Sequence, residues 1–467
     1  MEIDNQEDAA ACNAIEENLS ALSLNPINNV PEILIGPFQL LFSNQYYSEL
    51  EGVRAIRKLL SIESNPPINQ VISSGVAPTL IQMSYTRPHE FAFEVCWTLC
   101  NIGSGDSAST EYLISINSLT FFEKIFDYDP SSYELRDQIV WAIGNIAGDC
   151  SKYRDIVSSS KIYEKILLYA QILPINLSAK QANLAWTLSN LVRGKPHAKV
   201  EVASTVEKYF ILMLLQSNDD KVLIDVCWGL SYTSEIVNNK ILSNPAVGQK
   251  IIDLMKHANF SIALPSCRAL GNMISNYANS WEYLKDFNIC QVLRIGLKSQ
   301  KRTFRKESAW ILSNLCAESS EVITAMVENQ IYEFLTEIYK GGEENVVMNE
   351  IVWVIGNSAN SAKSEQMKSI YKSGAVLVII EYLKVADTDK VKAVILEALI
   401  EIVKKLSEDF SEEYYNLIVD AEDICNGNSR TVELYDKLIQ KLEEKGFGKE
   451  DDYEEQDEGM KPQIEFL

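Results

Sequence analysis

The stretch Ile139–Asp149 reads IVWAIGNIAGD. Its apolar residues recur at helical spacing, and Asn145 follows Trp141 by four residues. Two residues at that separation lie one turn apart on the same face of a helix. The stretch therefore predicts a helix with a Trp/Asn pair on one of its faces.

The Trp/Asn pair recurs along the chain, and we call the whole series the Trp/Asn ladder. Four more pairs are complete and two are degenerate: Trp97 with Asn101, Trp186 with Asn190, Trp310 with Asn314, Trp353 with Asn357, then Trp228 with Tyr232 and Arg268 with Asn272. Successive pairs are 40 to 45 residues apart, a period of helical armadillo or HEAT repeats and of WD40 propeller blades. A blade needs four strands and a Trp-Asp ending, whereas these tryptophans lie in helical patterns. The spacing therefore predicts an all-α, armadillo-repeat solenoid of about ten repeats, wound into a right-handed superhelix.

A turn followed by a second helix precedes the ladder helices. Gly75 lies 22 residues before Trp97 in such a turn, and Gly374 begins a similar one in the unit after Trp353. Asn288 and Gln330 are expected to hold the equivalent turns in between. Each repeat is therefore predicted to contain several helices, which bury their apolar faces by stacking on the next repeat.

Composition divides the chain into three parts. Residues 1–40 are acidic and polar, contain no lysine or arginine, and are expected to be largely disordered. A helical pattern with Gly, Pro, Asn and Ser breaks predicts the repeat array over residues 41–447. Residues 448–467 form an acidic tail, with seven carboxylates among residues 450–458.

The net charge of −23 at neutral pH sets the expected partners. A surface this acidic repels nucleic acid and anionic lipid, so neither is expected as a partner, and it attracts basic proteins. The plainer alternative is that the acidity only keeps the chain in solution. No apolar run is long enough to cross a membrane, and the acidic N-terminus lacks the pattern of a secretion signal.

The chemically reactive residues argue against a metal site, a cofactor or an enzyme. The nine cysteines are scattered singly without a C-x-x-C pair, and the three histidines are far apart. No glycine-rich phosphate loop joins a strand to a helix, since GNIAGD continues a helix, and no Ser/His/Asp set can be argued. We therefore expect no catalytic residue, no metal and no cofactor.

A repeated Trp/Asn pair has a structural interpretation and a functional one. A tryptophan in a repeat helix usually belongs to the core, and an asparagine one turn later can cap or bridge a loop. Asparagine is a poor helix former, however, and a buried amide needs partners at both ends. Its return at one offset in so many repeats favours an exposed row whose partners arrive from outside.

An exposed ladder predicts a binding groove for an extended, basic peptide. Asparagine amides can donate to and accept from a peptide main chain, and the tryptophans between them form slots for the long stems of Lys and Arg. A cation near an indole face gains about 0.5 to 2 kcal/mol. Carboxylates near the ladder would favour the charged heads: Asp149, Asp225, Glu235 and Glu350.

These features resemble the importin-α family of nuclear import adaptors over residues 40–447. The family has Trp-Tyr as its fourth pair and Arg in place of Trp in its fifth, as in Trp228/Tyr232 and Arg268/Asn272. The strings GNIAGD at 144–149 and WTLSNL at 186–191 are also typical of it. The resemblance implies an adaptor, not an enzyme, that binds Lys/Arg-rich nuclear localisation signals of cargo proteins and shuttles between cytoplasm and nucleus.

The resemblance also assigns residues to two signal-binding sites. The major site would comprise Trp97, Asn101, Gly105, Thr110, Gln138, Trp141, Asn145, Asp149, Trp186, Asn190, Arg193, Asp225, Trp228 and Tyr232. Within it, the ammonium group of a key lysine would be met by Asp149, the Thr110 hydroxyl and the Gly105 carbonyl. The minor site would comprise Arg268, Asn272, Trp310, Asn314, Glu350, Trp353 and Asn357.

Two departures from the family pattern change these expectations. Ala278 and Trp281 stand where the family has an Asp and a Thr for the minor-site lysine, so the minor site is expected to be weak. Residues 1–53 hold nine acids and no base, whereas the family begins with a basic segment that binds importin-β and folds into its own major groove. We therefore expect no self-inhibition, and a coupling to importin-β that is missing or different. The acidic tail suggests the family's export receptor as a further partner.

The main alternative is an armadillo scaffold or peptide-binding protein that is not coupled to importin-β. Junctional and vacuolar anchors of this fold have basic grooves or lipidation signals, and neither is visible here. Glu2 follows Met1, whereas N-terminal myristoylation requires glycine at that position.

Overall fold

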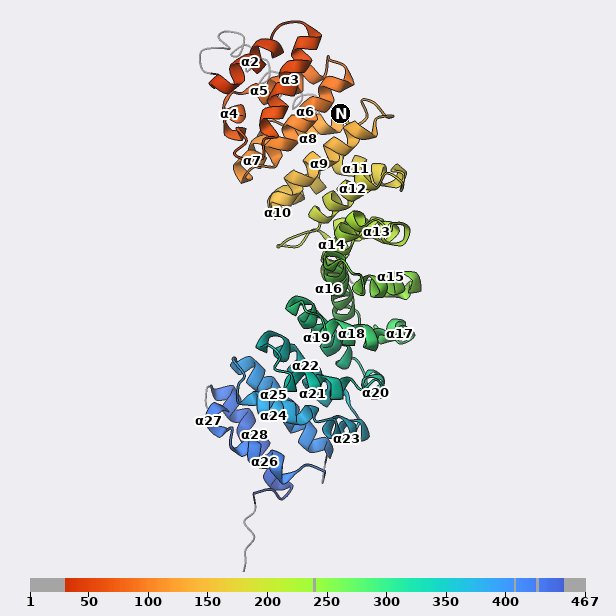
Figure 1. Ribbon diagram of the computed structural model, residues 1–467, viewed down its shortest axis with the longest axis vertical. Helices are drawn as coiled ribbons and strands as arrows, with labels where there is room; N and C mark the ends of the chain where they lie inside the picture. Colours follow the sequence, from red (N-terminus) through yellow and green to blue (C-terminus); the bar gives the residue numbers. More distant parts are fainter. Residues whose placement is uncertain (1–29, 238–240, 407–408, 426–427, 449–467) are drawn as a thin grey trace, which may run out of the picture. The chain divides into compact units, whose positions relative to one another are not determined.

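The computed structural model describes residues 30–237, 241–406, 409–425 and 428–448. Its regular elements are all helices in these ranges, which confirms the predicted all-α class (Figure 1). The chain separates into two compact units, Met1–Tyr277 and Ala278–Leu467. Within the described residues, no helix is long and apolar enough to span a membrane.

The first unit contains the helices that carry the first five ladder pairs. They are α2 (Glu32–Leu41), α3 (Tyr46–Leu60), α4 (Ile68–Ser73), α5 (Val76–Ser84), α6 (His89–Gly103), α7 (Ser107–Ser115), α8 (Ser118–Ile125), α9 (Tyr133–Asp149), α10 (Ser151–Ser158), α11 (Lys161–Ile172), α12 (Ser178–Asn190), α13 (Val200–Gln216), α14 (Asp220–Ile236), the 3-10 helix η1 (Ile241–Ser243), α15 (Pro245–Met255) and α16 (Phe260–Asn276).

The second unit contains the helices that carry the last two pairs. They are α17 (Trp281–Leu284), α18 (Ile289–Leu297), α19 (Arg302–Cys316), α20 (Ser320–Glu328), α21 (Ile331–Lys340), α22 (Asn345–Ser361), α23 (Ser364–Lys372), α24 (Ala375–Leu383), α25 (Asp389–Leu406), α26 (Glu412–Val419), α27 (Glu422–Cys425) and α28 (Ser429–Glu444).

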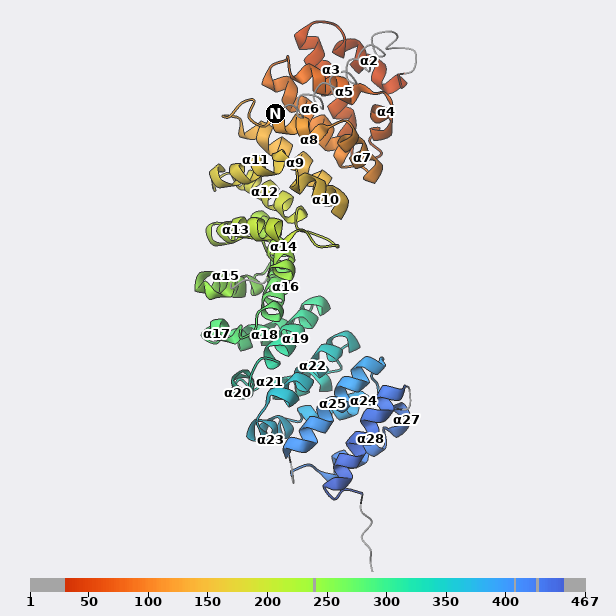
Figure 2. The ribbon, with the colours of Figure 1, turned by 180° about the vertical axis from the view of Figure 1, so that it is seen from behind.

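Within each unit, the long third helix of one repeat stacks on the third helix of the next repeat. In the first unit α6, α9, α12, α14 and α16 pack in that order, and the two views show them side by side (Figures 1 and 2). In the second unit α19, α22, α25 and α28 do the same. These helices bury almost continuous apolar faces, because those inside each stack pack on the third helices of both neighbouring repeats. The predicted repeat arrangement is confirmed.

Most of the turns between the two shorter helices of a repeat use a left-handed residue, as the sequence suggested. Gly75 has φ +68° and Gly374 has φ +84°, where a side chain would be strained. Asn117 and Gln330 adopt the same region at φ 59° and 53°. Asn288 does not, because its φ is −77° and it precedes α18 in an ordinary conformation.

The ordered array begins earlier than the predicted boundary at residue 41. Helix α2 lies inside the segment assigned to residues 1–40 and buries Leu34, Phe38 and Leu41 where it packs against α3. Gly52 of α3 permits this contact, since a Cβ there would lie 2.5 Å from the backbone nitrogen of Leu41. Residues 1–29 and the tail from residue 449 on lie outside the described residues, so the expectations for them stay predictions.

Candidate peptide-binding site

Helix α9 is shaped to receive the ladder residues of the next repeat. The Ser132 side chain caps its first turn by accepting from the backbone N–H of Leu135. A Cβ at Gly144 would overlap the ring of Trp186, and one at Gly148 would lie 2.9 Å from the Asn190 side-chain nitrogen. The two glycines of GNIAGD therefore let α12 approach closely, which the sequence pattern did not reveal.

The tryptophans of the ladder differ in exposure. Trp141 is 46% exposed, and it is the most open of them. The other ladder tryptophans are partly buried: Trp97, Trp186, Trp228, Trp310 and Trp353. The rings of Trp228 and Tyr232 stack on each other, with centroids 5.9 Å apart. The ladder thus presents indole surface, as the groove prediction requires, and Trp141 presents most of it.

The ladder asparagines are anchored inside the protein by their side-chain nitrogens. Asn145 donates to the carbonyl oxygen of Cys100 at 3.0 Å, and Asn190 donates to the carbonyl of Gly144 at 3.2 Å. In each case the accepting residue directly precedes the ladder asparagine of the previous repeat. The same side chain therefore lines the ladder and joins two repeats.

This rule extends along both units. Asn272 donates to the carbonyl of Ser231 at 2.9 Å, and Ser231 directly precedes Tyr232. In the second unit Asn357 donates to the carbonyl of Ser313 at 2.8 Å. At the front, the nitrogen of Asn101 bonds to helix α3, at 2.9 Å from the Ser61 hydroxyl.

The anchoring corrects the expectation of a fully exposed asparagine row. Asn190 is only 3% exposed and Asn272 6%, because the amide nitrogen points into the repeat junction. This bond uses one of the two N–H donors of each amide. The Oδ1 oxygens of Asn145 and Asn190 have no partner among the described residues, so each offers a ligand an acceptor held in a fixed orientation.

The predicted lysine contacts come together at the start of helix α7. The Ser107 hydroxyl donates to Oδ1 of Asp149 at 2.8 Å, which joins α7 to the end of α9. The other Asp149 oxygen, Oδ2, is buried without a hydrogen-bond partner in the described chain, and so is the Thr110 hydroxyl oxygen. An unpaired buried carboxylate oxygen is costly, and an ammonium group would satisfy it.

A cavity of about 260 Å³ lies at this place. Its lining holds Gly103, Ser104, Gly105, Gly144, Asn145, Gly148, Asp149, Trp186, Asn190 and Arg193. Six of these residues were assigned to the major site from the sequence. Gln138 and Thr110 are buried and do not belong to this lining. The other predicted major-site residues lie on α6, α9 and α14, and these helices pack in one stack together with α12.

Asp225 stands one turn before Trp228 on α14 and is half-buried. Burial raises the pKa of its carboxyl group to about 6, and no counter-charge contributes to that shift. Burial also raises the pKa of the Tyr232 hydroxyl, while the nearby Arg193 lowers it. The acid is therefore not neutralised by an ion pair, and a ligand cation could fill that role.

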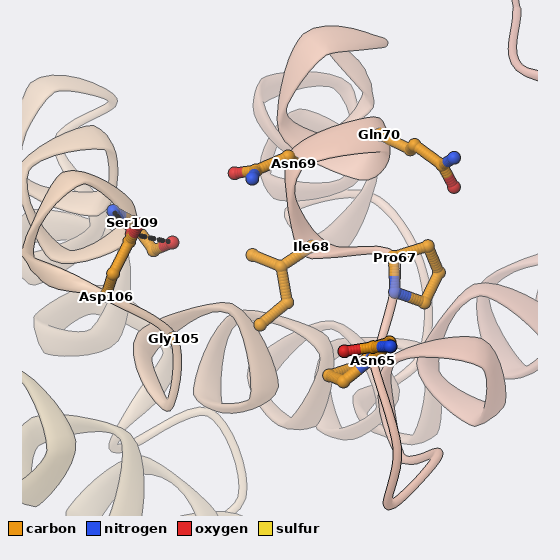
Figure 3. A pocket seen from close by; sticks show the side chains of 9 residues that line it. Asn65, Pro67, Ile68, Asn69, Gln70, Gly105, Asp106 and Ser109 are labelled. Carbon is orange, nitrogen blue, oxygen red and sulfur yellow. Dashed lines mark hydrogen bonds between the residues drawn. The ribbon is translucent and has the colours of Figure 1, made fainter.

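A second, polar cavity of about 450 Å³ adjoins the first through Gly105, which lines both. It is lined by Asn65, Pro66, Pro67, Ile68, Asn69, Gln70, Gly105, Asp106 and Ser109. Figure 3 shows Ile68 between Pro67 and the Asp106–Ser109 pair, whose side chains are hydrogen-bonded at 2.8 Å. The sequence signal for this cavity is the Asn-Pro-Pro break at residues 65–67, which ends one repeat and opens the next.

The predicted minor site divides between the two units, with Arg268 and Asn272 in the first and the other residues in the second. Lys306 lies 3.9 Å from Glu350, and Lys390 lies over the Trp353 ring at 5.8 Å from its centroid. The side-chain nitrogen of Asn314 is buried without a partner in the described chain. Two lysines of the chain itself therefore already lie beside the Glu350 carboxylate and over the Trp353 ring.

Trp281, after helix α16, belongs to the interior of the second unit. Trp281 is buried at the start of α17, and its backbone N–H donates to Glu318 at 3.0 Å. The hydroxyl of Ser280 also donates to that carboxylate. The Glu318 carboxylate is therefore used within the second unit. Ala278 has no polar side-chain group that could bind a ligand lysine. Among the described residues, no group of His, Cys, Asp and Glu side chains is arranged to hold a metal ion.

Comparison with known proteins gives a consistent result. The chain is 31% identical to importin subunit alpha-1b of Oryza sativa subsp. japonica over 431 residues, which cover 89% of this chain and 79% of that protein. It is 32% identical to importin subunit alpha-3 of Arabidopsis thaliana over 474 residues, covering 98% and 86%. No family model matches the chain.

The fold has a solved counterpart as well. An engineered protein of known structure superimposes with a TM-score of 0.74 at 18% sequence identity, covering 88% of this chain and 99% of the engineered one. At that identity the likeness concerns the fold alone.

Proposed function

The chain belongs to the importin-α family, and on that premise we propose that it is a receptor for Lys/Arg-rich nuclear localisation signals. The signal binds in an extended conformation along the ladder of the first unit. As a member of this family the chain is a binding protein and not an enzyme. One observation supports the proposal above the others: two buried acceptors, Asp149 Oδ2 and Thr110 Oγ1, lack partners in the described chain where the key lysine would bind.

The lysine slot works by charge and by shape. The ammonium group of a signal lysine donates to Asp149 and Thr110, while its aliphatic stem packs on indole surface. Ser107 holds Asp149 in place by bonding its other oxygen, so one carboxylate oxygen stays aimed at the ligand. Arginine has a wider, planar head, so this compact slot should prefer lysine.

The asparagines hold the signal without reading its sequence. With one bond from their nitrogens to the preceding repeat, Asn145 and Asn190 present the amide oxygen to a bound chain in a fixed orientation. That oxygen accepts a main-chain N–H of an extended peptide, which every residue but proline provides. Side-chain selectivity then comes from Trp141, Asp149 and Asp225.

We infer that the minor site of the second unit is weak. Lys306 beside Glu350 and Lys390 over Trp353 would compete with a basic ligand for the same acid and the same ring. A lysine of the ligand would have to displace Lys306 or Lys390. The net gain in binding free energy would therefore be small.

The partners follow from the same proposal. Cargo proteins with basic signals are the primary partners, and an export receptor is a further one, with the protein distributed between cytoplasm and nucleus. The net charge of −23 disfavours nucleic acid and anionic membranes as partners. Residues 1–53 contain no lysine or arginine, so no basic segment from this stretch enters the acidic slot.

A second candidate function is a peptide-binding scaffold that is not coupled to importin-β. It is favoured by the same absence of basic residues over 1–53. Mixing the chain with importin-β separates the two candidates. A tight complex would show that import coupling operates by another route, and no complex would favour the scaffold.

The central proposal is tested at Asp149. A lysine-rich signal peptide is titrated against the wild-type chain and against Asp149→Lys. Charge reversal in the slot should weaken binding at least about a hundredfold, since it replaces an attraction with a buried repulsion. Glu164→Lys reverses an exposed charge on the outer helix α11 and is the charge-matched control. Unchanged affinity in Asp149→Lys, with the helical circular dichroism intact, would refute the proposal.

A further inference from the structure

The first ladder tryptophan is already covered by a cation of the same chain. The guanidinium of Arg57, on α3, lies over the Trp97 ring of α6 with its central carbon 4.1 Å from the ring centroid. The Arg57 Nε also donates to Oε2 of Glu94 at 3.0 Å. The Arg57 side chain is 15% exposed and that of Glu94 is 7% exposed, so the arrangement is largely shielded from water.

This arrangement repeats what the ladder is proposed to do with a ligand. Glu94 stands three residues before Trp97, as Asp225 stands three before Trp228. At both of these rungs a carboxylate and an indole lie on one helical face and together suit a Lys or Arg side chain. Among the described residues, no cation contributes to the pKa shift of Asp225. The Glu94 carboxylate, by contrast, is paired with Arg57.

We propose that Arg57 is a built-in competitor that closes the α3 end of the ladder and so limits how many basic residues of a ligand are read. The inference rests on the proposed function, because it concerns the same ligand and the same groove. A ligand cation at the covered face of Trp97 would have to displace Arg57 from both the ring and Glu94. The basic run is therefore read from the open rungs at Trp141 onward, and Arg57 is a specificity-determining residue.

Arg54 provides a matched comparison within the same cluster. It also pairs with Glu94, at 3.0 Å, and further contacts Glu51 and Glu90. Its guanidinium is not the one over the Trp97 ring. Removing either arginine thus makes the region more acidic by one charge, but only the loss of Arg57 uncovers the indole.

The test compares Arg57→Ala with Arg54→Ala, using a peptide of five lysines and two longer peptides with two extra lysines at one end or the other. In the wild type, the extensions should add little at physiological salt. In Arg57→Ala, one extension should bind about 2- to 30-fold more tightly than the short peptide, the range expected for one cation at an indole face. Arg54→Ala should show no such gain.

The outcomes separate the two proposals. Equal gains in both variants, or no gain in Arg57→Ala while the short peptide still binds, would overturn the competitor role and leave the proposed function standing. Failure of the wild type to bind any of the peptides would overturn both. Should Arg57→Ala not fold, Arg57→Gln removes the cation, keeps a hydrogen-bond donor for Glu94, and must show the same selective gain.

Discussion

The side-chain nitrogen of Asn145 lies 3.0 Å from the carbonyl oxygen of Cys100, across the junction of two repeats. The bond leaves the amide oxygen as the group that a ligand can meet, and it fixes where that oxygen points. Asn145, which its spacing identifies as a ligand contact, thus also joins two repeats. A substitution at this position can test both the binding role and the structural role.

Asn145→Asp should lose stability and affinity together. The new carboxylate keeps an oxygen for the ligand but places a second oxygen against the Cys100 carbonyl, so the anchor becomes a repulsion. We expect a loss of about 1 to 3 kcal/mol in the free energy of unfolding, measured by denaturant titration, and weaker peptide binding. Asn176→Asp, at an exposed position, is the control and should change neither quantity. A fully stable Asn145→Asp chain would show that the anchor is unimportant.

Binding of a lysine-rich peptide should depend on pH through Asp225. Its pKa of about 6 in the free protein lies above the ordinary value of 3.8 because burial disfavours the charge. A ligand cation favours the ionised form, so binding lowers this pKa and releases a proton. Affinity should therefore fall as the pH drops below about 6, by up to about tenfold per pH unit. For the free chain the sign is opposite, since this group favours the folded state more as the pH falls from 6 towards 3.8.

The control for this prediction is Asp225→Asn, which removes the titrating group. Peptide titrations at several pH values between about 5 and 7.5 should give a flatter dependence for the variant than for the wild type. Parallel curves for the two proteins would assign the pH dependence to another residue.

Gly144→Ala should distort the lysine slot by displacing a neighbouring side chain, because glycine has no side chain of its own to offer a ligand. The added methyl would overlap the Trp186 ring and lie 2.6 Å from the hydroxyl of Thr187, which itself bonds to the Val140 carbonyl. Overpacking of this kind costs about 1 to 3 kcal/mol, and displacement of Trp186 should weaken binding. Gly36→Ala is the control in α2, where no atom lies within 4 Å, and it should be neutral or slightly stabilising in a thermal melt.

Lys405 should stabilise the last rung of the second unit. Its ammonium donates to the carbonyls of Ala359, Asn360 and Ala362 at 2.6 to 2.9 Å, where helix α22 ends. Burial lowers the pKa of this lysine, since it disfavours the charged form. The hydrogen bonds to the three carbonyls stabilise the ammonium group. Lys405→Met should cost about 1 to 3 kcal/mol. Hydrogen exchange should report faster opening of α22, and the first unit is the internal reference. Unaltered exchange in α22 would contradict the role.

The repeat fold was predictable because its signal is local and recurs. Apolar spacing and the Trp/Asn offset identify the third helix of each repeat, and Gly75 marks a turn that only a left-handed residue makes easily. Helix α2 could have been found from its apolar residues Leu34, Phe38 and Leu41, but the acidic composition around them concealed it.

The site was predictable only in part, since its decisive contacts link residues about one repeat apart. Spacing places Asn190 on the face of Trp186 but does not indicate that its nitrogen meets the Gly144 carbonyl. Likewise, no pattern links Arg57 to Trp97, because the two lie on different helices and the contact depends on how these helices stack. Such contacts become visible only when the repeats are assembled.

The asparagine anchors have a consequence for how this surface can change over generations. An exchange at Asn190 that altered the grip on cargo would also loosen the junction between α9 and α12. The ladder itself is therefore resistant to piecemeal variation. New cargo preferences should arise instead at flanking acids such as Asp225, whose carboxyl group has no ion pair to lose.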